Sequence, residues 1–307
     1  MTNVIRIATR SSRLALWQAE YIRSLLEAAG GVVEIIHIRT EGDRNQSDPL
    51  RQFGGTGLFT REVQRAVLDS AADVAVHSLK DLPTQSADGL TLAAVPDRAA
   101  TADVLLLPHG QTPLDSLDQL PKGSRVGTGS PRRQAQLLHH RPDLQTLEIR
   151  GNVETRIRKL DEGEFDAIVL AEAGLNRLEL SDRISFRLTP PLVYPAVGQG
   201  AIGVECRADD EATQRLLARI TNPSVLASVT AERSLLAALR AGCHAPLGAA
   251  TSLKEDRLTL TGVLLSTDGK ERLEATLTDD VSNAFETGQA VASQLISLGG
   301  SKLVDAF

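Results

Sequence analysis

The feature that most constrains the fold is an alternation of strand and helix patterns that occurs twice along the chain. In the first series, apolar runs typical of strands cover residues 4–8, 32–38 and 73–78, with amphipathic helix patterns between them. This alternation is typical of a parallel sheet that is covered by helices on both faces. Ser11 or Ser12 can cap the first helix, because a hydroxyl there accepts from a free backbone N–H group.

The second series begins after a break in this pattern, in the stretch "VPDRAATADVLLL". Its expected strands cover residues 103–107, 125–128, 145–150 and 166–171, and a Pro- and Gly-rich crossing, "TPPLVYPAVGQG", leads to one more apolar strand at 201–207. Two α/β domains joined by two strand-like connections would form a hinged cleft. Ligands of such sheets bind beyond the carboxyl ends of the strands.

The chain changes character from Pro223 onward. One helix pattern at about 224–241 precedes a group of alternating segments, and a final helix pattern follows them, which suggests a small α+β domain. We therefore expect three domains, with hinges at about 98–103 and 194–200. The first domain would comprise residues 1–98 plus 200–220, the second residues 104–193, and the third residues 223–307.

Charge and composition exclude several classes of protein. With a net charge of −6 and a pI of about 5.6, the chain is not expected to bind nucleic acid through bulk electrostatics. No apolar run approaches the roughly 18 residues of a membrane helix. The N-terminus begins directly with a strand pattern, so we expect a cytoplasmic protein. Two cysteines cannot form a disulfide framework, and the four-ligand spacing of a zinc site is absent, so no metal is expected.

Arginine dominates the basic residues: six of the 33 are lysines, which leaves 27 arginines. A guanidinium binds a carboxylate or phosphate in a bidentate way that lysine cannot match. Surface salt bridges could explain the same excess, so the positions must decide. The expected strands 4–8, 73–78, 125–128, 145–150 and 166–171 are each followed by an arginine, a lysine or a hydroxyl residue. Because helix N-termini add N–H groups there, the pattern predicts a cleft that binds several anions.

Two further residues allow more than one interpretation. Asp81 follows Lys80 at the end of an expected strand, where it could simply cap a turn. In an arginine-lined cleft it could instead stabilise a cationic intermediate or move a proton. Cys243, in "LRAGCHAPLGA", could be a small buried residue, although the flanking glycine and proline favour a turn. Cys206 lies inside an apolar strand and is expected to be buried.

Several segments together resemble one family. They are "RIATRSSRLALWQA", "GLFTRE", "ADVAVHSLKDLPT", "VGTGSPRRQAQL", "IRGNVETR", "DAIVLAEAGLNRL", "PAVGQGAIGVECR" and "AERSLLAALRAGCHAPLGA". They occur in the family's order and span essentially the whole chain. On these segments the chain resembles the hydroxymethylbilane synthases, or porphobilinogen deaminases, of tetrapyrrole and heme biosynthesis. The resemblance implies two α/β domains similar to type II periplasmic binding proteins around a hinged cleft, and a small α+β C-terminal domain.

The resemblance also implies a transferase reaction. Four porphobilinogen molecules are joined head to tail, each with loss of ammonia, and water releases the linear tetrapyrrole hydroxymethylbilane. One dipyrromethane cofactor, bound through a thioether to Cys243, primes the growing chain. Porphobilinogen is the implied small-molecule partner, no nucleic acid or membrane is implied, and a monomer is expected.

The resemblance assigns the residues of the site. Asp81 is the implied catalytic residue, because a carboxylate can stabilise the cation that loss of ammonia leaves. Each substrate carries an acetate and a propionate, which suits a cleft rich in arginine. Besides Cys243, the implied cofactor-binding residues are Lys80, Asp81, Thr128, Ser130, Arg132, Arg133, Arg150 and Gly151. The implied substrate-binding residues are Arg10, Ser12, Arg150, Asn152, Arg156, Arg177 and Gln199.

Departures from the family pattern and two alternative functions remain to be considered. Thr56 stands where the family usually has lysine, so the stretch 43–57 is expected to hold carboxylates less strongly, or to rely on Arg51 and Arg61. A hinged anion-binding protein without catalysis would explain the two domains and the arginines. It would need neither a cysteine on a turn nor Asp81 among cations. A transferase acting on phosphorylated substrates is disfavoured by the missing P-loop lysine and the missing metal-ligand cluster.

Overall fold

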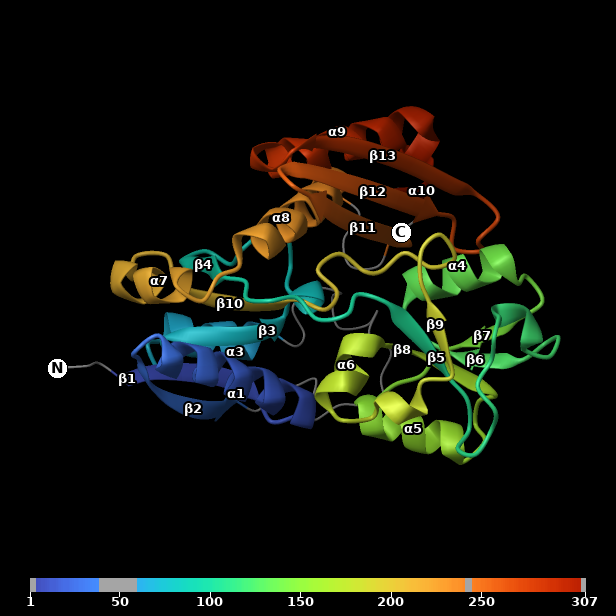
Figure 1. The fold of residues 1–307 in the computed structure, drawn as a ribbon, viewed down its shortest axis with the longest axis horizontal. Helices are drawn as coiled ribbons and strands as arrows, with labels where there is room; N and C mark the ends of the chain where they lie inside the picture. The colour runs from blue at the N-terminus through green and yellow to red at the C-terminus, as the bar shows by residue number, and fades with distance from the viewer. Residues whose placement is uncertain (1–3, 39–59, 241–244, 305–307) are drawn as a thin grey trace. The chain divides into compact units, whose positions relative to one another are not determined.

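The structure, a computed structural model, describes residues 4–38, 60–240 and 245–304. The chain divides into two compact units, one formed by residues 1–99 and 200–226 and the other by residues 100–199 and 227–307. Each unit is described by itself. The first holds one α/β sheet, and the second holds another α/β sheet together with a three-stranded sheet (Figure 1).

The first sheet has the strand order β2-β1-β3-β10-β4. Its strands are β1 (Val4–Arg10), β2 (Val32–Ile38), β3 (Val74–Ser78), β4 (Leu90–Ala94) and β10 (Ile202–Arg207), and its helices are α1 (Arg13–Ala28), α3 (Arg61–Leu68) and α7 (Glu211–Ala218). Helices cover both faces, because two separate cores flank the sheet. One core contains Ile22 of α1 and Leu217 of α7, and the other contains Val63 and Val67 of α3.

The second sheet has the strand order β7-β6-β8-β5-β9. Its strands are β5 (Asp103–Leu106), β6 (Arg125–Gly127), β7 (Gln145–Leu147), β8 (Ala167–Ala171) and β9 (Phe186–Leu188), and its helices are α4 (Pro131–His140), α5 (Val153–Asp161) and α6 (Glu172–Arg177). Leu137 of α4 belongs to one core, whereas Leu160 of α5 and Leu175 of α6 belong to the core on the opposite face.

The two sheets repeat one topology. In each, the first, second and third strands of a βαβ series run parallel in the order second-first-third, and a strand from elsewhere in the chain lies beside the third. That added strand, β10 or β5, runs antiparallel to its neighbours. The strands of each βαβ series are thus parallel, as expected, and each sheet is completed by strands that the series does not include. The two added strands adjoin the connections between the units, so they enter each sheet from the edge where the parallel strands end.

The three-stranded sheet has the order β11-β12-β13, all antiparallel. Its strands are β11 (Leu247–Lys254), β12 (Arg257–Leu265) and β13 (Arg272–Asp280), and its helices are α8 (Pro223–Ala238), α9 (Ala284–Leu295) and α10 (Ser301–Val304). A buried core that includes Leu235 of α8 and Leu295 of α9 joins the helices to the sheet. The expected pair of α/β domains and a small α+β domain is thus confirmed.

Helix α4 packs against the three-stranded sheet within the second unit. Ala135 of α4 shares a buried cluster with Tyr194, Val263 and Leu265.

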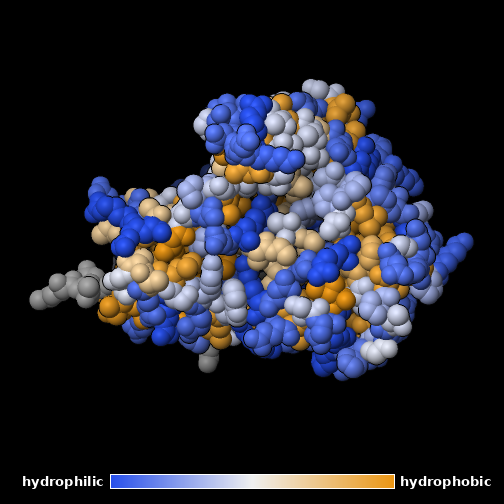
Figure 2. Space-filling model, viewed as in Figure 1, coloured by the Kyte–Doolittle hydropathy of each residue, from blue (hydrophilic) through white to orange (hydrophobic). Residues whose placement is uncertain are grey.

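Hydrophilic residues cover much of the face seen in Figure 2, with apolar patches scattered among them. None of the helices within the described residues combines the length and hydropathy needed to cross a membrane. Short helical segments complete the fold at Leu79–Asp81 (η2), Leu117–Gln119 (η3), Ser181–Arg183 (η4), Val281–Asn283 (η5) and Ile296–Gly300 (η6).

Candidate functional site

In the first unit, the predicted residues gather at the edge where β1 and β3 end. Arg10 is the last residue of β1, and Lys80 and Asp81 form the short helix η2 directly after β3. β1 and β3 are parallel neighbours, with Ala8 paired to Ala75, so both strands end at the same edge. Ser12 caps α1 at this edge by accepting from the N–H group of Ala15 at 3.4 Å, which confirms the predicted cap.

The side chain of Asp81 is exposed at this edge. Among the residues that the structure describes, its carboxylate has no hydrogen-bond or ion-pair partner. A carboxylate without a fixed partner can interact with a charge that develops on a ligand. The edge therefore offers one available acid beside the cations Arg10 and Lys80.

In the second unit, α4 begins at the edge where β6 ends. The hydroxyl of Thr128 accepts from the N–H group of Ser130 at 3.2 Å, and the hydroxyl of Ser130 caps α4 by accepting from the N–H group of Arg133 at 3.4 Å. These bonds shape the turn, and they place Arg132 and Arg133 in the first turn of the helix. The positive end of the helix dipole lies there, so this edge favours anions.

A second group of predicted residues follows β7 at the same edge, since β6 and β7 are parallel. Asn152 caps α5 by accepting from the N–H group of Thr155 at 2.9 Å. Gly151 has φ +112°, and a Cβ atom there would lie 2.6 Å from Cγ2 of Thr155, so only glycine fits. Its carbonyl accepts from Nε of Arg156 at 2.8 Å, which orients that guanidinium.

Arg150 carries a buried donor that has no partner within residues 4–38, 60–240 and 245–304. Its Nη1 atom is inaccessible to solvent and has no hydrogen-bond partner among the described residues. Its Nη1 atom forms a long ion pair with the half-exposed Glu148, with Nη1 and Oε1 3.8 Å apart, which is beyond hydrogen-bond distance. Buried polar atoms are nearly always paired, so an unpaired guanidinium nitrogen indicates a place for a ligand acceptor.

Arg132 and Arg133 are both bound by one carboxylate, that of Asp103 at the start of β5. Nη1 of Arg132 donates to Oδ2 at 2.7 Å, and Nη2 of Arg133 donates to Oδ1 at 2.7 Å. Burial by itself would raise the pKa of Asp103, but the two guanidiniums outweigh it and hold the pKa well below its usual range. Burial also lowers the pKa of Arg132, against the opposing effect of Asp103.

The remaining predicted residues of this unit, Gln199 and Arg177, are buried. Nε2 of Gln199 donates to the carbonyl of Thr101 at 2.7 Å and to Oδ1 of Asp103 at 2.9 Å. Gln199 thus supports the arginine pair rather than extending into solvent. Arg177 is the last residue of α6, which follows β8 at the same edge of the sheet.

Asp103 is a site residue that the sequence analysis missed. Site residues were expected after strands, whereas β5 runs antiparallel to β8 and therefore begins at the site edge. The signal in the sequence was an aspartate at the start of an otherwise apolar strand, which must find a cationic partner when it is buried. Gln136 was also missed: its amide binds both the N–H group and the carbonyl of Tyr194, at 2.7 and 3.0 Å, beneath Arg132.

The two cysteines differ in what can be said of them. Cys243, the predicted attachment point, lies outside the described residues, as does Thr56. Cys206 is fully buried in β10, as predicted, and burial raises the pKa of its thiol to about 11. Because the thiolate is the reactive form, Cys206 is chemically inert at neutral pH.

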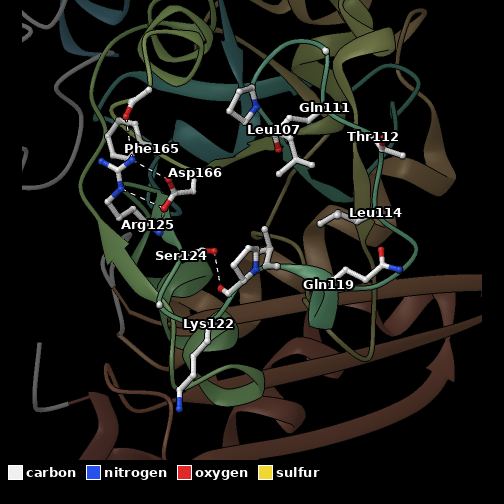
Figure 3. Close-up of a pocket in the computed structure, with 16 residues that line it drawn as sticks. Leu107, Gln111, Thr112, Leu114, Gln119, Lys122, Ser124, Arg125, Phe165 and Asp166 are labelled. Carbon is white, nitrogen blue, oxygen red and sulfur yellow. Dashed lines mark hydrogen bonds and ion pairs between the residues drawn. The ribbon is translucent and has the colours of Figure 1, made fainter.

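A cavity of about 780 Å³ lies elsewhere in the second unit (Figure 3). Arg125 and Asp166 line it and bind each other at 2.8 Å. Arg125 opens β6, so the cavity lies at the edge opposite the arginine pair, and it includes none of the predicted site residues. Within the described parts of the chain, no group of three or more metal-binding side chains comes together.

Comparison with known proteins decides the family. The family model described as "Porphobilinogen deaminase, dipyromethane cofactor binding domain" matches residues 5–215, and the model of the porphobilinogen deaminase C-terminal domain matches residues 226–297. The chain belongs to the porphobilinogen deaminase family. Porphobilinogen deaminase of Syntrophotalea carbinolica is 43% identical over 307 residues, covering 99% of this chain and 96% of its own. That of Maridesulfovibrio salexigens is 44% identical over 303 residues, covering 98% and 97%.

Membership in the porphobilinogen deaminase family makes the chain an enzyme, a transferase of tetrapyrrole biosynthesis with a dipyrromethane cofactor. It disfavours the alternative of an anion-binding protein without catalysis. Among solved structures, the methionine binding protein MetQ covers 74% of this chain and 93% of its own, with a TM-score of 0.46 and 12% identity.

Proposed function

We propose that the chain joins four porphobilinogen molecules head to tail into the linear tetrapyrrole hydroxymethylbilane, with release of ammonia. The observation that carries the proposal is the gathering of Arg132, Arg133 and Arg150 at one edge of the second sheet, with Asp103 as the only buried carboxylate bound to them in the described residues. A growing tetrapyrrole carries two carboxylates per ring, and guanidiniums are the groups best suited to bind them.

The residues at this edge fit a dipyrromethane cofactor that carries carboxylates. In the described part of the chain a buried nitrogen of Arg150 has no acceptor, and the guanidiniums of Arg132 and Arg133 share one carboxylate at the same sheet edge. Arg132, Arg133, Arg150 and the hydroxyls of Thr128 and Ser130 would hold the group through its carboxylates. When bound through Cys243, the cofactor supplies the pyrrole carbon to which the first substrate is joined.

Asp81 is the proposed catalytic residue. Loss of ammonia from porphobilinogen leaves a cation that is delocalised over the pyrrole ring and its nitrogen. A carboxylate near the ring N–H stabilises this cation electrostatically and accepts the hydrogen bond. Asp81 suits this role because it is exposed and has no partner among the described residues, in contrast to Asp103. Two carboxylates can thus have different roles because their surroundings differ.

The cations of the first unit would bind the incoming substrate. Arg10, with Ser12 at the start of α1, offers a guanidinium and a helix N-terminus at the edge that carries Asp81. The other residues that we propose for binding carboxylates of the substrate are Asn152, Arg156 and Arg177. In this proposal Gln199 contributes indirectly, through Asp103.

Intact-mass spectrometry of the purified protein tests the proposal. The expected mass exceeds that of the sequence by two pyrrole units, and peptide mapping should place the adduct on Cys243. Incubation with porphobilinogen should release ammonia and a linear tetrapyrrole, which closes in acid with loss of water to a porphyrinogen that added iodine oxidises to a porphyrin. An active protein with the bare mass would contradict the cofactor assignment. Our further prediction of a cytoplasmic monomer is tested by light scattering and cell fractionation.

A further inference from the structure

The carboxylate of Asp103 is fully occupied by protein donors. Its Oδ2 atom accepts from Nη1 of Arg132 at 2.7 Å. Its Oδ1 atom accepts from Nη2 and Nε of Arg133 at 2.7 and 3.0 Å, and from Nε2 of Gln199 at 2.9 Å. The residue is 0% exposed, so it cannot touch a ligand itself. Whatever Asp103 does for the reaction, it does through the arginines.

Each of the two arginines is also held at a second point. Nη1 of Arg132 donates to the carbonyl of Tyr194 at 2.6 Å, and Nη1 of Arg133 donates to the carbonyl of Val169, in β8, at 2.9 Å. A guanidinium that is bound to a carboxylate and to a backbone carbonyl has a fixed plane. Groups fixed in this way bind a ligand without a further loss of side-chain entropy.

Among the residues described, one negative charge faces the two positive charges of this arginine pair. Arg132 and Arg133 are only 5% and 6% exposed, and one carboxylate faces both of them. The N-terminal end of α4 adds further positive potential. Because a buried excess charge is costly, an anion that completes the balance would be bound strongly.

We propose that Asp103 is a positioning residue of the cofactor site, which holds Arg132 and Arg133 in the orientation that binds one cofactor carboxylate. Gln199 assists, because its Nε2 atom donates to Oδ1 of Asp103 and so helps to fix the orientation of that carboxylate. The inference rests on the proposed function, because it takes the cofactor as the ligand. It adds a residue that makes no contact with substrate or cofactor but determines whether the cofactor is loaded.

The experiment compares Asp103→Asn with the wild type in three measurements: the fraction of protein that carries the adduct by intact mass, the melting temperature, and KM and kcat. Asparagine keeps the shape but cannot neutralise two guanidiniums, so both should turn away. The expected result is a folded protein in which either the fraction loaded with cofactor or the value of kcat/KM is lower by roughly 100-fold. Full loading with normal KM in Asp103→Asn would overturn the proposal.

A second variant covers the case in which Asp103→Asn does not fold. Asp103→Glu keeps the charge but moves it by one methylene, so it should fold and still show reduced loading and a raised KM. A folded Asp103→Glu protein that loads and turns over like the wild type would also overturn the proposal. A purely structural role predicts that loading falls only in step with melting temperature, and that result would count against positioning.

Asp166→Asn is the matched control. Asp166 binds Arg125 with a comparable pair of bonds, at 2.8 and 3.3 Å, at the opposite edge of the same sheet. The cofactor loading and the KM of the Asp166→Asn variant should equal those of the wild type. The wild-type mass separates the two hypotheses: a bare wild-type mass contradicts the proposed function, whereas a loaded wild type with a normally loaded Asp103→Asn contradicts only this inference.

Discussion

The carboxylate of Glu232, on α8, accepts a hydrogen bond of 2.8 Å from the backbone N–H group of Gly198. Its other oxygen accepts from the hydroxyl of Thr251, on β11, also at 2.8 Å. Glu232 is 0% exposed. The buried side chain of Glu232 thus links helix α8 and strand β11 to the segment that contains Gly198 and Gln199.

Replacement of Glu232 by Leu should destabilise the protein by about 2 kcal/mol, because it leaves the N–H group of Gly198 buried and unpaired. Glu232→Gln, which keeps an acceptor, should cost less. Urea unfolding measures both. Glu211→Gln is the control, since its ion pair with Arg215 is highly exposed and should contribute about 0.5 kcal/mol or less. Equal losses for Glu232→Leu and Glu211→Gln would refute this reading of Glu232.

Replacement of Asp81 by Asn should abolish most of the turnover and leave the melting temperature unchanged. The side chain is exposed and, within the described residues, binds nothing, so the fold does not depend on it. Loss of a catalytic carboxylate typically costs roughly 10²–10⁴ in rate. The measurement is the rate of tetrapyrrole formation beside a thermal melt. Asp88→Asn, an exposed aspartate of the same unit, should behave like the wild type; a near-normal rate in Asp81→Asn would reduce that residue to a turn former.

Replacement of Arg150 by Met should stabilise the cofactor-free protein and impair the loaded enzyme. Removal of the unsatisfied Nη1 donor should add about 1 kcal/mol to the free energy of unfolding. The same change removes a proposed carboxylate ligand, so loading by intact mass should fall. Unfolding is compared on protein made in a host without porphobilinogen. Destabilisation of the cofactor-free form would show that Arg150 serves the fold.

The buried thiol of Cys206 gives a prediction about alkaline pH. Burial raises its pKa to about 11 from the ordinary value of 9.0. Between these pH values the unfolded chain has lost the proton that the folded chain retains, so folding stability falls as pH rises from 9 to 11. The loss from this group is roughly 2 to 3 kcal/mol.

Cys206→Ala tests this effect. Its free energy of unfolding should decline less between pH 9 and pH 11 than that of the wild type. Iodoacetamide at pH 8 should leave Cys206 unmodified in the folded protein and modify it in urea. Rapid labelling of native Cys206 would mean that β10 opens readily.

The sequence predicted those elements whose signals are local. The cap at Ser12, the burial of Cys206 and the strands that begin each series depend on neighbouring residues, and the structure confirms them. The direction of β5 and β10 is not local, because it depends on which edge a strand from a distant part of the chain enters. For the same reason Asp103 escaped notice: its partners Arg132 and Arg133 lie on another element.

Roles were harder to predict than positions. The sequence placed Gln199 among residues that bind substrate, and that role stays a prediction; in the structure its Nε2 atom donates to the carbonyl of Thr101 and to Asp103. Ser130 and Asn152 were predicted as ligand contacts, and their side chains cap helices. Hydroxyl and amide groups serve both purposes equally well, so only the geometry of the first turn distinguishes them.

The Asp103 cluster also bears on the order in which the protein folds. Its bonds join residues 29, 30 and 96 positions apart in the chain. Contacts of such separation form late, since the intervening chain must first be ordered. A nascent chain therefore acquires its arginine pair in working orientation only after residue 199 has been made and packed. Capture of the cofactor would then report that the second unit has completed its fold.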